Sequence, residues 1–235
     1  MPFTTIAFDA DDTLWQNEAL YQHAQQRFRQ SLLPWQSSAT IDAVLYEIEI
    51  RNLPIYGYGI KAFALSMIEA ALQLTDGNVS EEVLSSILSE TRAMLEAEVH
   101  LHPHVPETLS ALSATHPLML ITMGDLLDQT AKIQRSGLGN FFTYIEIVNE
   151  KTTDVYLEIL NRYKIEPARF LMIGNSLRSD IDPVLSIGGQ AVHIPTESAW
   201  AHDHVSDFDS SQRGYYQLDS LIELVDLIHR IEPQQ

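Results

Sequence analysis

The sequence contains no cysteine and is poor in basic residues. Of its 235 residues, 14 are Lys or Arg and 32 are Asp or Glu, which gives a formal net charge of −18. Without cysteine, the chain excludes disulfides, thiolate catalysis and cysteine-ligated metals. Its negative field repels nucleic acid and anionic membrane surfaces, so we expect neither as a partner. The same field repels phosphorylated metabolites, and a substrate of that class would need a local cation.

Long hydrophobic runs, internal repeats and low-complexity tracts are also missing from the sequence. The N-terminus leads directly into a predicted strand without a basic signal region, which favours a cytoplasmic protein. Hydrophobic residues make up 45% of the chain and charged residues 20%, as in ordinary globular proteins. This length suits one large domain, or a core domain that carries an insertion.

The most informative segment lies near the N-terminus. The apolar residues 6–8 predict the end of a buried strand, and Asp9, Asp11 and Thr13 follow directly. A carboxylate at the end of such a strand lies where open α/β sheets bind their ligands. Two carboxylates so close repel each other unless a cation lies between them or one of them is protonated. Mg²⁺ prefers oxygen ligands, and an aspartate beside it can attack phosphorus.

Two other interpretations of this segment have to be considered. A calcium-binding EF-hand loop that started at Asp9 would need glycine at its sixth position and glutamate at its twelfth. The sequence has Leu14 and Leu20 there, so the calcium interpretation fails. An acidic turn after a strand, with Asp and Thr in turn or capping roles, remains open at this point.

The rest of the chain divides into two regions with different hydrophobic patterns. Strand-like runs at 118–122, 144–148, 170–173 and 191–194 alternate with helical patterns at 105–114, 126–136, 153–163 and 180–186. This alternation predicts a parallel sheet covered by helices. Residues 15–100 instead carry successive helical patterns, at 19–33, 41–50, 60–74 and 80–98, and are too long for a simple crossover. We therefore predict an α/β protein, with a Rossmann-like doubly wound core (1–14 and 101–235) and an inserted all-helical cap (15–100).

Further polar residues follow the later predicted strands. Thr122 ends the run 118–122, Lys151 follows 144–148, and Gly174 ends the run 170–173 with Asp180 six residues beyond it. The ends of parallel strands open onto one edge of the sheet, so these groups are expected to share one crevice with the N-terminal aspartates. In this order, the motifs resemble those of the haloacid dehalogenase (HAD) superfamily of phosphotransferases. The resemblance covers essentially the whole chain, because the helical insertion lies where one subfamily carries a C1-type cap.

The resemblance implies a role for each of these residues. Asp9 would be the nucleophile that takes the phosphoryl group, and Asp11 the general acid/base. Thr122 would bind a phosphoryl oxygen, and Lys151 would supply positive charge beside it. Phosphoryl transfer depends mostly on positioning and charge stabilisation, which such a set provides.

The resemblance also implies a Mg²⁺ cofactor. Its ligands would be Asp9, the backbone carbonyl of Asp11, and Asp180. The family often has aspartate where this chain has Asn175. An amide oxygen can still coordinate the metal, so Asn175 remains a candidate ligand, but the site loses one negative charge.

The expected activity is hydrolysis of a small phosphorylated metabolite. The alternative within enzymes is a 2-haloacid dehalogenase, but relatives that release halide lack the second aspartate, and Asp11 is present here. A further alternative is a catalytically weak phosphate-binding protein of the same family, which Asn175 would favour.

Substrate specificity in capped relatives comes from residues of the cap. In this sequence the segment 54–59 has the composition of a loop, and Arg51, Tyr56, Tyr58 and Lys61 lie in or beside it. We predict that these four residues contact the substrate; a plain interhelical turn with aromatic packing is the alternative interpretation.

Overall fold

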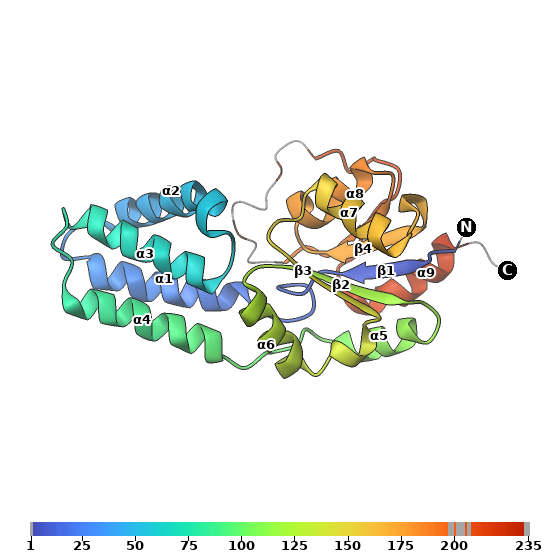
Figure 1. Cartoon of the computed structure of the whole chain (residues 1–235), viewed down its shortest axis with the longest axis horizontal. Coiled ribbons are helices and arrows are strands. Elements are labelled where there is room, and N and C mark those ends of the chain that lie inside the picture. Colours follow the sequence, from blue (N-terminus) through green and yellow to red (C-terminus); the bar gives the residue numbers. More distant parts are fainter. Residues whose placement is uncertain (1, 197–199, 201–204, 206–207, 233–235) are drawn as a thin grey trace.

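The structure is a computed structural model that describes residues 2–196, 200, 205 and 208–232, and within them a parallel sheet of six strands forms the centre. The strands lie in the order β3-β2-β1-β4-β5-β6 (Figure 1). Their bounds are Thr5–Phe8 (β1), Leu118–Met123 (β2), Tyr144–Val148 (β3), Phe170–Gly174 (β4), Gln190–His193 (β5) and Tyr215–Gln217 (β6). The predicted α/β fold with a parallel sheet is therefore confirmed.

Strand β1 lies inside the sheet, between β2 and β4. Its residue Phe8 is in register with Leu120 on one side and with Ile173 on the other. All four residues of β1 are buried, because helices cover both faces of the sheet. The order of connection changes direction at β1, and the crevice beyond the carboxyl end of such a strand is where doubly wound sheets bind ligands.

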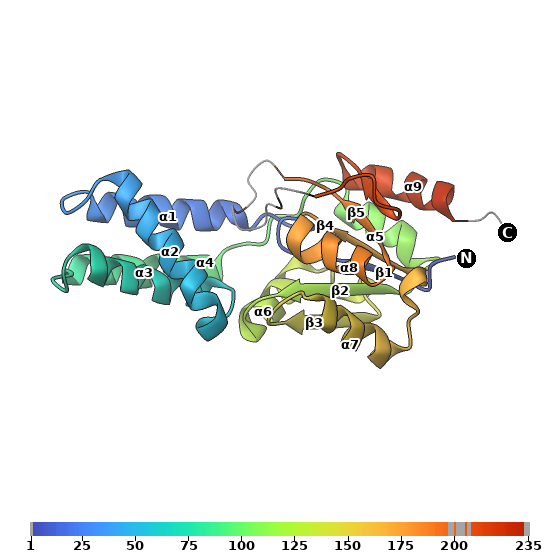
Figure 2. The same cartoon turned by 90° about the horizontal axis from the view of Figure 1, so that it is seen from above.

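Helices pack on both faces of the sheet (Figure 2). Phe8 shares one hydrophobic core with residues of α5 (Val105–Ser113) and α9 (Leu224–Ile231), whereas Ala7 faces a second core. That second core includes residues of α7 (Thr153–Tyr163) and α8 (Asp182–Ser186). Helix α6 (Leu126–Ser136) follows β2 and contributes Ile133 to the first core. None of the helices among the described residues is long and apolar enough to cross a membrane.

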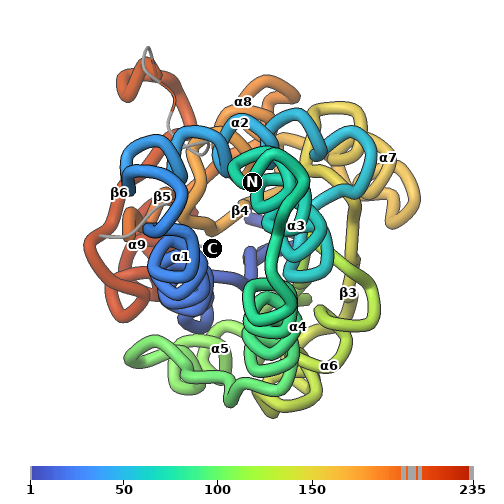
Figure 3. The backbone as a smooth tube through the Cα atoms, turned by 90° about the vertical axis from the view of Figure 1, so that its left-hand side faces the viewer, coloured from blue at the N-terminus to red at the C-terminus, as the bar shows by residue number. Residues whose placement is uncertain are grey.

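Four further helices form a bundle beside the sheet, which we call the helical bundle (Figures 1 and 3). They are α1 (Glu18–Leu32), α2 (Ser38–Tyr56), α3 (Ile60–Leu74) and α4 (Glu81–Glu96). The bundle has a hydrophobic core of its own, which includes Phe28, Leu45 and Met67. Ser80 caps α4 by accepting a hydrogen bond from the Val83 amide, as expected for serine before a helix.

The chain enters and leaves the helical bundle through two adjacent segments. The Gln16 amide donates to the His100 carbonyl at 2.9 Å, and the His102 amide donates to the Leu14 carbonyl at 2.9 Å. These bonds hold the two connections side by side. The predicted division into core and cap at 14/15 and 100/101 falls within this paired segment and stays a prediction.

Two local expectations need correction. The segment 54–59 is not a loop throughout, because α2 continues through Pro54 to Tyr56. Proline in the last helical turn removes only one intrahelical hydrogen bond, and the residue that follows the helix is Gly57, whose φ of 72° suits glycine. The predicted helix 180–186 is a π-type turn over Leu177–Ile181 followed by α8.

Candidate active site

Three charged side chains form a buried cluster at the carboxyl ends of the strands. Lys151, which follows β3, donates from Nζ to Asp9 Oδ1 at 2.5 Å and to Asp180 Oδ1 at 2.7 Å. The Lys151 side chain is 2% exposed and that of Asp180 is 1% exposed. One ammonium group thus balances two carboxylates that come from opposite halves of the sheet.

The electrostatics of this cluster follow from burial and close charges. Burial raises the pKa of Asp9 to about 7; the Lys151 ammonium lowers it, and the Asp180 carboxylate adds to the increase. Burial works against a charged Lys151, but Asp180 and Asp9 together raise the pKa of Lys151 above its ordinary value. Lys151 therefore remains an ammonium group at neutral pH.

Asp11 lies next to this cluster, and its carboxylate is held by three donors. Trp15 Nε1 donates to Oδ1 at 2.6 Å, and Gln129 Nε2 donates to Oδ2 at 2.8 Å. Lys132 Nζ lies 2.7 Å from both oxygens. Lys132 and Gln129 come from α6, so the helix after β2 fixes the orientation of Asp11.

A group of oxygen atoms faces the Asn175 side chain. Turned to satisfy its hydrogen bonds, the amide nitrogen donates to Thr13 Oγ1 at 3.1 Å, Asp9 Oδ2 at 3.3 Å and the Asp11 carbonyl at 3.3 Å. Turned the other way, the amide oxygen joins these oxygen atoms. Oxygen atoms gathered in this way are the ligands that Mg²⁺ uses.

The residues present therefore fit a hard cation. Asp9, the Asp11 carbonyl and Asn175 would hold it, with Asp180 nearby. The described residues contain no group of three or more His, Cys, Asp or Glu side chains arranged for a metal. Two of the candidate ligands are instead a backbone carbonyl and a side-chain amide. In addition, Lys151 lies between the carboxylates of Asp9 and Asp180.

The end of strand β4 packs tightly against the Asp180 side chain. A β-carbon at Gly174 would collide with the Asp180 side chain, so the strand end reaches the carboxylate only because position 174 is glycine. Asp180 Oδ2 also accepts a hydrogen bond from the Ser176 amide at 3.1 Å.

Thr122 is fully buried, and its Oγ1 has no hydrogen-bond partner in the described part of the chain. Such a hydroxyl is available to a ligand.

Asp12, between the two parts of the motif, has a structural role. Its φ is 61°, and its carboxylate accepts hydrogen bonds from the Asn17 and Glu18 amides at 2.9 and 3.0 Å. It thereby satisfies the first free amides of α1. The interpretation as an acidic turn with capping residues is thus correct for Asp12, whereas Asp9 and Asp11 point into the crevice.

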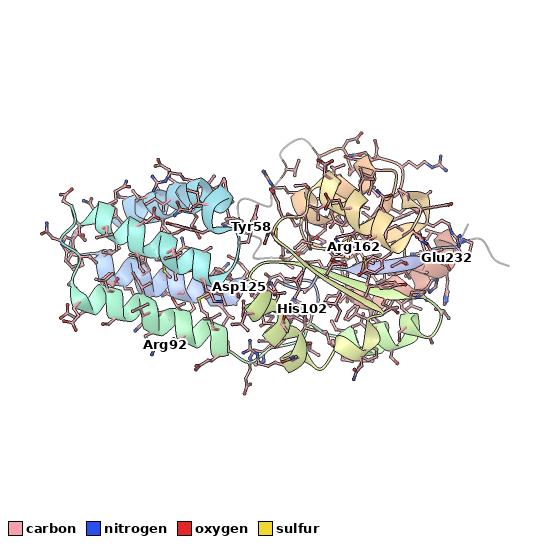
Figure 4. All side chains as sticks on the ribbon, viewed as in Figure 1. Tyr58, Arg92, His102, Asp125, Arg162 and Glu232 are labelled. Carbon is pink, nitrogen blue, oxygen red and sulfur yellow. The ribbon has the colours of Figure 1, made fainter. Side chains whose placement is uncertain are left out.

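A cavity of about 370 Å³ lies between the strand ends and the helical bundle. The predicted site residues Asp9, Asp11, Thr122, Lys151, Asn175 and Asp180 all line it. Of the four predicted specificity residues, only Tyr58 does; Figure 4 shows it where the helical bundle meets the sheet.

The other three predicted specificity residues do not line the cavity, because acidic neighbours hold them elsewhere. Arg51 Nη2 lies 3.1 Å from Glu69 Oε2, and the Tyr56 hydroxyl donates to Glu69 Oε1 at 2.9 Å. Lys61 Nζ donates to Asp125 Oδ1 at 2.8 Å, which joins α3 to the start of α6. Contact of Arg51 and Lys61 with the substrate stays a prediction, although in this structure both side chains pair with carboxylates away from the cavity.

Sequence reasoning also missed the residues of α6 that face the cavity. Asp128, Gln129 and Lys132 are buried although they are polar. They lie on one helix face at a spacing of three to four residues. In the sequence, this row of polar residues on a helix that packs against the sheet was the signal that could have identified them.

Comparison with known proteins agrees with this fold. The family model of the haloacid dehalogenase-like hydrolases matches residues 3–188. A haloacid dehalogenase-like family hydrolase from Xanthomonas campestris is 34% identical, with a TM-score of 0.87 and coverage of 97% of this chain and 91% of that chain. No curated protein matches the sequence.

Two more distant structures share the fold. A predicted phosphoglycolate phosphatase from Haemophilus somnus is 16% identical, with a TM-score of 0.65 and coverage of 96% and 97% of the two chains. A 2-haloacid dehalogenase from Pseudomonas syringae pv. tomato is 23% identical, with a TM-score of 0.62 and coverage of 98% and 100%. The chain described here belongs to the haloacid dehalogenase-like hydrolases.

Proposed function

We propose that this hydrolase cleaves phosphomonoesters of a small metabolite, using Asp9 as the nucleophile. The observation that carries the proposal is that Asp9 and Asp11 line one cavity together with Thr122, whose hydroxyl has no hydrogen-bond partner among the described residues. One Asp9 oxygen attacks phosphorus while the bond from phosphorus to the leaving oxygen breaks. The resulting aspartyl-phosphate is then hydrolysed by water.

The other residues support this reaction by position and charge. Thr122 donates to a phosphoryl oxygen, and the Lys151 ammonium offsets the charge that collects there. Asp11, held by three donors, accepts the proton of the attacking water in the second step. In the first step it protonates the leaving oxygen, and for that it must itself first take up a proton.

Mg²⁺, when bound by Asp9, the Asp11 carbonyl and Asn175, would neutralise phosphoryl charge and so allow an anionic substrate to approach the carboxylates. Neutralisation of the substrate's charge matters especially in a chain of net charge −18, which repels anions. The amide of Asn175 supplies a neutral ligand where a carboxylate would add a charge, so the metal site is expected to be weak.

Dehalogenation of 2-haloacids is the competing activity. It needs a nucleophilic aspartate but no general acid, since halide is a good leaving group. Asp11 and the three side chains that orient it would then have no chemical task. The arrangement of Trp15, Gln129 and Lys132 around Asp11 therefore favours ester cleavage.

The experiment that separates these activities compares two substrates under matched conditions. Hydrolysis of 4-nitrophenyl phosphate is measured with excess Mg²⁺ and with excess chelator, and halide release is measured from 2-chloropropionate. The variants are Asp9→Asn and, as a control, Asp219→Asn at an exposed site. We expect Mg²⁺-dependent hydrolysis in the wild type and the control, and none in Asp9→Asn.

Two results would contradict the proposal. Halide release without phosphate release would establish the dehalogenase. Binding of phosphate with no turnover of any ester would establish a phosphate-binding protein. Full activity in chelator would leave ester cleavage intact but remove Mg²⁺ from it.

A further inference from the structure

The part of the cavity away from the strand ends is formed by the helical bundle. Glu18 and Tyr21 of α1, Glu49 and Asn52 of α2, and Phe63 of α3 line it. The leaving group of a substrate whose phosphate lies at Asp9 would occupy this part, so these side chains meet the organic half of the substrate.

Carboxylates greatly outnumber cations around the cavity. Its lining contains seven acidic residues (Asp9, Asp11, Asp12, Glu18, Glu49, Asp128 and Asp180) but only two basic ones among the described residues, Lys132 and Lys151. All 14 Lys and Arg residues of the chain lie in the described ranges, so none is left to join them. Both lysines already pair with aspartates. A second anionic group on the substrate would therefore find no unpaired lysine or arginine in the described lining.

Several of the carboxylates surround one side chain of the bundle. The Tyr21 hydroxyl is affected by the charges of Asp11, Asp128, Glu18 and Glu49; together with burial, which is the largest cause, they hold the pKa of Tyr21 well above its ordinary value. These acidic residues of α1, α2 and α6 all line the one cavity, so their charges act together within it.

Glu49 has no ion pair or hydrogen bond within the described part of the chain. Burial and the charge of Glu18 raise the pKa of Glu49 to about 8. Asp128 is 5% exposed, and its Oδ1 also has no hydrogen-bond partner there, although Oδ2 lies 3.8 Å from Lys132. Carboxylates removed from water are ordinarily paired. The half-buried Glu49 has no cationic partner among the described residues, and Asp128 has only Lys132, which lies closer to Asp11.

We infer, on the basis of the proposed function, that the substrate is a phosphomonoester whose organic group carries an ammonium ion, with Glu49 as its carboxylate partner and Asp128 beside it. An ammonium group would supply the missing positive charge. Tyr21 and Phe63, whose ring centroids lie 5.2 Å apart, line the same wall, and aromatic rings also attract cations. A neutral leaving group would leave Glu49 unpaired, and a carboxylate would face like charges.

The test uses three esters of similar size and different charge: 2-aminoethyl phosphate, n-propyl phosphate and carboxymethyl phosphate. We expect kcat/KM for the ammonium ester to exceed that for the propyl ester by about ten- to hundredfold, the usual value of a hydrogen bond to a charged group. The carboxymethyl ester should be the poorest of the three. 4-Nitrophenyl phosphate serves as the reference for the chemical step.

Matched variants assign the preference to Glu49. In Glu49→Gln the ratio between the ammonium and propyl esters should fall to within about threefold, since one hydrogen bond remains but the charge is lost. Glu47→Gln, which changes an exposed glutamate of the same helix, should keep the wild-type ratio. Asp128→Asn should reduce the ratio as well. Thermal unfolding of each variant confirms that it is folded.

The outcomes separate this inference from the proposed function. Turnover of 4-nitrophenyl phosphate together with an equal or better rate for the propyl or carboxymethyl ester would overturn the ammonium inference and leave the phosphatase in place. The same holds if Glu49→Gln keeps the wild-type preference. No turnover of any of the four esters would overturn both.

Discussion

Replacing Lys151 with methionine removes the ammonium group that Asp9 and Asp180 share. Lys151 Nζ bonds both carboxylates, at 2.5 and 2.7 Å, and all three side chains are nearly inaccessible to water. Methionine fills a similar volume but cannot balance charge. The variant therefore leaves two buried carboxylates that repel each other.

The size of the effect follows from this geometry. Removing one partner of a buried ion pair costs about 3–5 kcal/mol of unfolding free energy. Because Lys151 pairs with two carboxylates, we expect a loss of unfolding free energy in the upper part of this range. Proton uptake by Asp9, whose pKa is about 7, limits that loss. We expect a loss of about 4 kcal/mol at pH 8, which for a chain of this length lowers Tm by about 8–16 °C.

Urea unfolding at pH 8 without metal measures this loss, with Lys164→Met at an exposed lysine as the control. Mg²⁺ should then stabilise Lys151→Met more than the wild type, because a divalent cation can replace the missing ammonium charge. A loss below about 1 kcal/mol, the value of an exposed ion pair, would show that Lys151 does not hold the two carboxylates together in solution.

Three further predictions follow from single side chains. The pKa of Glu49 rises from an ordinary 4.5 to about 8 on folding, so its burial destabilises the protein progressively between those pH values; Glu49→Gln should gain up to about 4 kcal/mol over the wild type at pH 9 but little at pH 5, and an equal change at both would contradict the buried charge. Thr122→Val should keep stability within about 1 kcal/mol and lower kcat/KM for 4-nitrophenyl phosphate about tenfold or more, because its hydroxyl has no hydrogen-bond partner among the described residues; unchanged kinetics would make Thr122 purely structural. Asp11→Asn should slow n-propyl phosphate about a hundredfold more than 4-nitrophenyl phosphate, since only the poor leaving group needs an acid; equal losses on both esters would argue against proton donation by Asp11.

Much of the core was predictable because its signals are local. The apolar runs before Asp9, Thr122 and Gly174 are long enough to identify strands, and the parallel arrangement follows from the helices between them. The strand β6 (Tyr215–Gln217) was not predicted, because it lies at the edge of the sheet, is partly exposed and lacks the uniformly apolar sequence of the buried strands. The αL conformation of His104, with φ of 66°, was equally hidden, because it is set by the turn that leads into α5.

The candidate site likewise has a part that the sequence predicts and a part that it does not. Asp9, Asp11, Lys151 and Asp180 were identified from motifs at strand ends, and the structure brings them together. The wall formed by the helical bundle was not predictable, because it depends on which face of each helix turns toward the sheet. Arg51 was chosen for its charge, yet it pairs with Glu69 and does not line the cavity.

The most direct test of the proposed chemistry is the covalent state of Asp9 during turnover. Wild-type protein is mixed with 4-nitrophenyl phosphate and Mg²⁺, quenched in acid within a single turnover and digested, and the peptide that contains Asp9 is examined by mass spectrometry. We expect a phosphoryl group on Asp9 that hydroxylamine removes and that is absent in Asp9→Asn. Hydrolysis of the ester with Asp9 unmodified at every time point, or a modification at another residue, would contradict the role of Asp9 as nucleophile.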